Sequence, residues 1–97
     1  MMTMMCPERS LCRSLLAAVF FGPVEDRDDT LDGDSLVIFS PVREDGSFVA
    51  SVSPVGDLWA ADLMVDTGIV WASVEPSMQE AFIALAGATT ALLRTGH

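Results

Sequence analysis

Apolar residues recur at helical spacing near both ends of the chain and alternate with polar residues between them. Near the N-terminus the helical spacing begins after Pro7, which suits a first helical turn, and Gly22-Pro23 interrupts it. This pattern predicts a helix over residues 7–21 with one apolar face. That face comprises Leu11, Cys12, Leu15, Leu16, Val19 and Phe20.

The C-terminal pattern begins at a helix-capping sequence. Ser77 and Glu80 have the spacing of a capping box, and Pro76 would occupy the first helical position if Glu75 were the cap. Either cap predicts a helix that starts there and continues to Arg94. Its apolar stripe consists of Met78, Phe82, Leu85, Thr89 and Leu92.

Two strand-like runs, residues 36–42 and 47–53, flank a four-residue loop that ends in Gly46 and so predict a β-hairpin. Pairing Val42 with Ser47 separates the alternating side chains into two faces. The face expected in the core holds Val37, Phe39, Phe48, Ala50 and Val52. The opposite face holds Leu36, Ile38, Val49, Ser51 and Ser53.

A second hairpin is predicted from residues 58–65 and 69–74, which surround Asp66-Thr67-Gly68. The expected core face holds Trp59, Ala61, Leu63, Val65, Ile69 and Trp71, and the other face holds Ala60, Asp62, Met64, Val70, Ala72 and Val74. The two tryptophans fit a core beneath the helices, and the opposite strand parity would expose both as a binding surface.

Residues 25–34 contain six acids and one arginine. Mutual repulsion and Gly33 disfavour regular structure there, so this segment is predicted to be a solvated acidic loop. It supplies one set of candidate partner-binding residues: Glu25, Asp26, Asp28, Asp29, Asp32 and Asp34.

The order of these elements predicts a single two-layer α+β domain over residues 1–97. In it a four-stranded antiparallel sheet, made of two hairpins, carries the N-terminal and C-terminal helices on one face. Apolar side chains occupy both faces of the predicted sheet, and two helices can cover only one. We therefore expect the other face to bind a protein partner or a second copy in a homodimer, through Leu36, Ile38, Val49, Val70, Ala72 and Val74.

Composition restricts the chemistry of this domain. Fourteen acids and five arginines give a formal net charge of −9, which disfavours direct nucleic-acid binding and favours a partner with a basic surface. Such acidity also simply keeps an apolar protein in solution. The only histidine is His97, the final residue, so no serine or cysteine has a positioned histidine base. Residues 28–39 imitate a calcium loop but place Phe39 where the bidentate glutamate belongs.

The sequence therefore predicts a non-enzymatic protein with no catalytic residue, no metal ligand and no cofactor. No apolar run approaches the roughly 20 residues that span a bilayer, so no membrane association is expected. Cys6 and Cys12 are six residues apart in the predicted helix, too far for a disulfide. Two unpaired thiols indicate a cytoplasmic protein.

The layout resembles the class I chaperones of type III secretion systems. The similarity lies in the N-terminal amphipathic helix, the segment Leu31–Phe39 leading into strands, and a closing helix over Phe82–Leu85. The resemblance implies an acidic, dimeric α+β protein that masks or carries a protein partner.

A competing hypothesis is a phage-type inhibitor that imitates nucleic acid. Carboxylates of residues 25–34 would replace phosphates and block a basic groove of a nucleic-acid-binding complex. Complexes of such a mimic should weaken steeply with salt, whereas an apolar contact should not.

Overall fold

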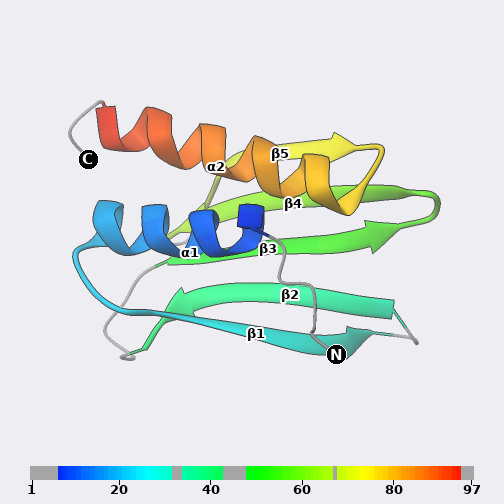
Figure 1. The fold of residues 1–97 in the computed structure, drawn as a ribbon, viewed down its shortest axis with the longest axis horizontal. Coiled ribbons are helices and arrows are strands. Elements are labelled where there is room, and N and C mark those ends of the chain that lie inside the picture. Colours follow the sequence, from blue (N-terminus) through cyan, green and yellow to red (C-terminus); the bar gives the residue numbers. More distant parts are fainter. Residues whose placement is uncertain (1–6, 32–33, 43–47, 67, 95–97) are drawn as a thin grey trace.

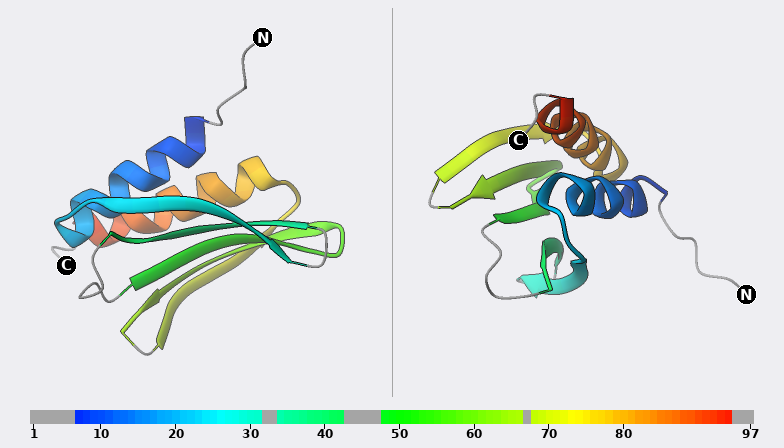
Figure 2. Two further views of the ribbon diagram at one scale, coloured as in Figure 1. Left: turned by 90° about the horizontal axis from the view of Figure 1, so that it is seen from below. Right: turned by 90° about the vertical axis from the view of Figure 1, so that its left-hand side faces the viewer.

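A computed structural model describes residues 7–31, 34–42, 48–66 and 68–94, without the side chains of residues 30, 31 and 34. The elements are α1 (Pro7–Phe20), β1 (Val24–Leu31), β2 (Asp34–Pro41), β3 (Phe48–Val55), β4 (Leu58–Val65), β5 (Gly68–Glu75) and α2 (Met78–Arg94). The strands form one antiparallel sheet in the order β1-β2-β3-β4-β5. Figures 1 and 2 show α1 and α2 side by side on one face of this sheet. The α+β class and the placement of both helices are confirmed.

The sheet has five strands rather than the predicted four, because residues 24–31 form β1 and not a solvated loop. The side chains of β1 alternate between the two faces of the sheet, and on each face an arginine lies beside the acids. Asp26 faces the helices beside Arg9 of α1, while Arg27 lies between Glu25 and Asp29 on the other face. These cations offset the repulsion that led us to expect a loop, and the ladder with β2 pairs the backbone.

The register predicted for the first hairpin is confirmed. A pairing of Val42 with Ser47 requires Phe39 opposite Ala50 and Val37 opposite Val52, and both pairs are present. All five residues predicted for the core face of this hairpin are buried.

The second hairpin contains an irregularity that the alternating pattern did not predict. Leu63 pairs with Trp71, but its neighbour Met64 pairs with Ile69, so Val70 is an extra residue on β5. This β-bulge reverses the faces of the residues before Trp71. Ile69, expected in the core, lies across from Met64 and is 65% exposed. Val70 turns toward the helices.

The core lies between the helices and the inner face of the sheet. α1 and α2 run in the same direction (Figure 1), and the Cys12 thiol donates to the Phe82 carbonyl at 3.1 Å. The Phe82 ring meets Phe39 edge to face, with centroids 6.2 Å apart. Trp59 and Trp71 pack against this core while partly buried, which confirms the core interpretation of both tryptophans.

The predicted helix termini are largely confirmed. The Ser77 hydroxyl accepts from the Glu80 amide at 3.2 Å and donates to the Glu80 carboxylate at 3.2 Å, so the capping box starts α2. At the end of α1 the Gly22 amide donates to the Ala17 carbonyl at 3.2 Å. The left-handed residue of this motif is Phe21, with φ of 58°, although glycine usually occupies that position.

Candidate protein-binding surface

The sheet face opposite the helices is uncovered by any described part of the chain. We call it the outer face. Both helices pack on the inner face, with α2 over β3, β4 and β5 and α1 beside β1 (Figure 2). Side chains that alternate away from the helices therefore meet solvent in the single chain.

Two apolar rows lie on the outer face, one across β3, β4 and β5 and the other across β3 and β4 alone. Near the β4–β5 turn, Val49, Met64 and Ile69 are cross-strand neighbours and are 39%, 38% and 65% exposed. Near the β3–β4 turn, Val55 pairs with Leu58 and both are exposed. Neighbouring apolar side chains on adjacent strands form a surface suited to contact with another polypeptide.

The centre of the outer face is polar. The Ser51 hydroxyl donates to a carboxylate oxygen of Asp62 at 2.9 Å, and these residues oppose each other on β3 and β4. Arg27 and Ile38 extend the same row toward β1, and Ala72 ends it on β5. The outer face is therefore two apolar rows separated by a hydrogen-bonded pair, not a continuous apolar surface.

Five of the six residues predicted for an apolar contact lie on this face. Leu36 and Ile38 are half-buried, and Ala72 and Val74 are exposed, as is Val49. Val70 is the exception, because the bulge places it on the helix side.

Residues that the sequence prediction did not select add to the surface. Val55 lies outside the strands predicted over residues 47–53 and 58–65, and Leu58 is the first residue of the second. The strands instead continue to a two-residue turn in which Gly56 has φ of 60°. Glycine at the first position of such a turn is a hairpin signal that could have located both residues.

The predicted acidic set does not converge on one surface. Asp26 and Asp28 face the helices, and both bind Arg9, at 2.6 Å and 3.0 Å. Hydrogen bonding to Asp26 raises the pKa of the Arg9 guanidinium, and burial opposes that rise. The stabilisation from this cation is present below its ordinary pKa and is lost only as the pH rises through the higher folded value.

The remaining acids lie on or beyond β1. Glu25 and Asp29 share Arg27 on the outer face, at 4.0 Å and 3.5 Å. Asp34 begins β2. Asp32 lies outside the described residues. The described acids are thus divided between two faces, and an arginine accompanies each pair.

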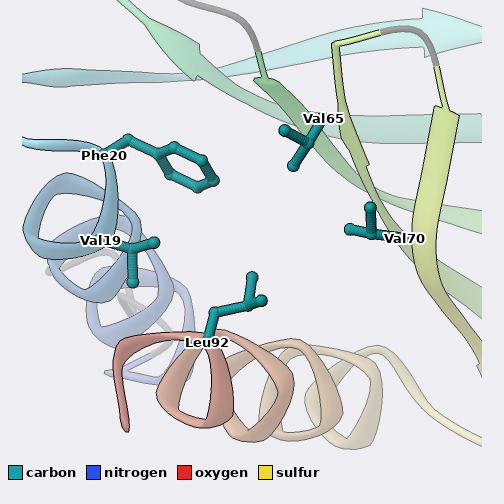
Figure 3. A pocket seen from close by; sticks show the side chains of 5 residues that line it. All are labelled: Val19, Phe20, Val65, Val70 and Leu92. Carbon is teal, nitrogen blue, oxygen red and sulfur yellow. The ribbon is translucent and has the colours of Figure 1, made fainter. Parts of the chain in front are cut away.

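An apolar cavity of about 240 Å³ opens where the C-terminal ends of both helices meet the β4–β5 hairpin. Figure 3 shows its lining side chains pointing toward a common space: Val19, Phe20, Val65, Val70 and Leu92. Phe20 also stacks on Phe48, with ring centroids 4.1 Å apart. Because its lining side chains are all apolar, this cavity offers mainly apolar contact.

No group of three or more metal-ligating side chains occurs within the described residues. Across that same part of the chain, no helix is long and apolar enough to cross a bilayer. Comparisons with known proteins found no matching family model, no similar curated protein and no similar solved structure.

Proposed function

We propose that this protein is a non-catalytic binding module that masks or carries a protein partner on the outer face of its sheet. The observation that supports the proposal is the placement of both helices on the inner face, which leaves two apolar rows open to solvent. Burying such side chains in a complex contributes about 25 cal/mol per Å² of apolar surface removed from water.

Charge supports a role for β1 in partner selection. The net charge of −9 attracts basic protein surfaces over long range, and Glu25 and Asp29 border the outer face. Complementary charge raises association rates, whereas apolar contact slows dissociation. A partner segment with apolar residues flanked by basic ones fits this arrangement.

Paired lysine substitutions test the proposal directly. Val49→Lys/Leu58→Lys places charges in both apolar rows, on β3 and β4. The control Leu11→Lys/Ile83→Lys alters two similarly exposed residues, at 49% and 50%, on the helices. Each double variant carries the same formal charge of −7, because two lysines are added to −9.

The assay is capture of host proteins by the purified protein at low and moderate salt. We expect one partner to be retained at both salt concentrations by the native protein and by the helix control, and lost by the outer-face variant. Capture that disappears at moderate salt, and that is the same for the native protein and the outer-face variant at low salt, would instead support a nucleic-acid mimic. Equal capture by all three proteins would contradict the outer-face assignment.

A further inference from the structure

β1 and β5 are the two edges of the sheet, and each has only one neighbouring strand. An edge strand presents unpaired backbone N–H and C=O groups that can pair with a strand of another chain. Backbone hydrogen bonds beyond helices and strands join Gly22 to Ala17, Val42 to Pro23 and Ala81 to Ser77. Within the described residues none of them reaches β5, so its outer edge is open.

β5 lacks the charges that usually protect an edge. Its sequence from Gly68 to Val74 contains no charged residue. Glu75, at the end of the strand, accepts a hydrogen bond from the Ser73 hydroxyl and is half-buried. The bulge at Val70 protects only the first part of the strand, and the five residues 71–75 pair regularly with β4.

The exposed side chains of β5 are apolar and would stabilise a strand paired with its open edge. Ile69 and Val74 are 65% and 58% exposed, and Ala72 is exposed between them. All three belong to the outer face, so a strand added beside β5 would meet uncharged, apolar side chains there. Cross-strand apolar pairs contribute roughly 0.2–1 kcal/mol each, in addition to the backbone ladder.

Two copies of this chain could pair through their edges in three ways, and charge and symmetry favour pairing β5 with β5. Pairing β1 with β1 would set two strands with five charges in eight residues side by side. Pairing β1 with β5 would leave a free edge on each end and extend without closing. Pairing β5 with β5 closes by two-fold symmetry and leaves the acidic strands at the far ends of a ten-stranded sheet. With strands about 4.8 Å apart they would be roughly 43 Å from each other, well beyond a Debye length of about 8 Å.

We propose that two copies of this chain associate by antiparallel pairing of their β5 strands. The interface is small, because it is one strand and its neighbouring side chains, so we expect a dissociation constant of about 1–100 µM. The continuous outer face would be twice as wide as in one chain. This dimer does not depend on the binding function proposed above, and its failure would leave the capture experiment intact.

The oligomeric state tests the proposal with matched variants. Native protein at about 500 µM should have a weight-average mass of about 18–21 kDa by light scattering or sedimentation, approaching twice the 10.4 kDa chain. Ile69→Lys/Val74→Lys should run at 10.4 kDa, while Leu11→Lys/Ile83→Lys, with the same net charge, should remain dimeric. A native monomer at this concentration, or an edge variant that stays dimeric, would overturn the proposal.

Distances between spin labels make the test independent of the lysine variants. Single cysteines at Ala72 on β5 and Asp29 on β1, with Cys6→Ser and Cys12→Ala, would carry the labels. An edge dimer gives a short distance between the Ala72→Cys positions and a distance of about 40 Å between the Asp29→Cys positions. Sheets stacked on their outer faces would give two similar distances, which would refute edge pairing in favour of face-to-face association.

Discussion

β1 and β5 occupy equivalent places at the two edges of one sheet, yet their side chains are opposite in character. β1 carries five charges in eight residues; Arg9 of α1 binds the acids on its inner face, and its own Arg27 binds those on its outer face. β5 has one charge at its end and a bulge near its start. The contrast shows that one edge of a sheet can carry the charges that discourage pairing with another strand while the other edge lacks them.

The comparison predicts that the two arginines that bind acids of β1, Arg9 from α1 and Arg27 from β1 itself, differ in their effect on stability. Arg9→Met removes a cation whose side chain is 27% exposed and which binds Asp26, 15% exposed. Asp26 would lose a charged hydrogen-bond partner, so we expect the free energy of unfolding to fall by about 1.5 kcal/mol. Urea unfolding at fixed protein concentration measures this change.

The matched control is Arg27→Met, which removes the arginine that lies on β1 itself. Its ion pairs are longer, at 3.5 Å and 4.0 Å, and half-exposed, so the expected loss is below about 0.5 kcal/mol. Equal losses for the two variants would show that the inner ion pair does not hold β1 against α1.

Deletion of Val70 would remove the β-bulge, which is the feature of β5 that hinders pairing with another strand. Every recorded pair between β4 and β5 survives the deletion, because Ile69 and Trp71 already oppose consecutive residues of β4. A straight edge should pair better with a second copy, so we expect the dimer dissociation constant to fall about fivefold, from one or two additional cross-strand pairs. Sedimentation equilibrium measures this constant, and an unchanged or weaker dimer would show that the bulge does not limit association. Val70→Ala, which keeps the bulge, is the control.

The smallest expected effect concerns the chain that leads into β1. Phe21 has φ of 58° and its side chain is 89% exposed. Left-handed backbone costs a non-glycine residue roughly 1–2 kcal/mol, and glycine loses part of that gain through its greater freedom when unfolded. We expect Phe21→Gly to raise the free energy of unfolding by about 0.5 kcal/mol, measured by thermal or urea unfolding. Phe21→Ala retains the Cβ atom and should give no such gain.

Sequence patterns predicted those elements in which local preference and burial agree. The register of the first hairpin followed from its alternation, since a shift by one residue would turn Phe39 and Phe48 away from the core. The capping box at Ser77 was equally local, because its two partners are three residues apart. Five of the six apolar surface residues followed from the same alternation.

The missed features depend on residues that are distant in the sequence. β1 was predicted to be a loop because six acids in ten residues repel one another. The structure reverses this outcome with Arg9, which is 17 residues from Asp26 and comes from α1. Val70 was misplaced because periodicity assumes a regular strand, whereas pairing with β4 determines where the bulge occurs.

By itself the sequence determined the two amphipathic helices, the faces of the central strands, the acidic character and the excess of apolar residues over what two helices can cover. These follow from the backbone period of each element and from side-chain chemistry. Only the tertiary structure decided that the acidic segment is an edge strand, that Val70 faces the helices and that β5 is the unprotected edge. Each of these depends on which strand or helix lies alongside, because neighbours supply the counter-charges and hydrogen-bond partners that local sequence lacks.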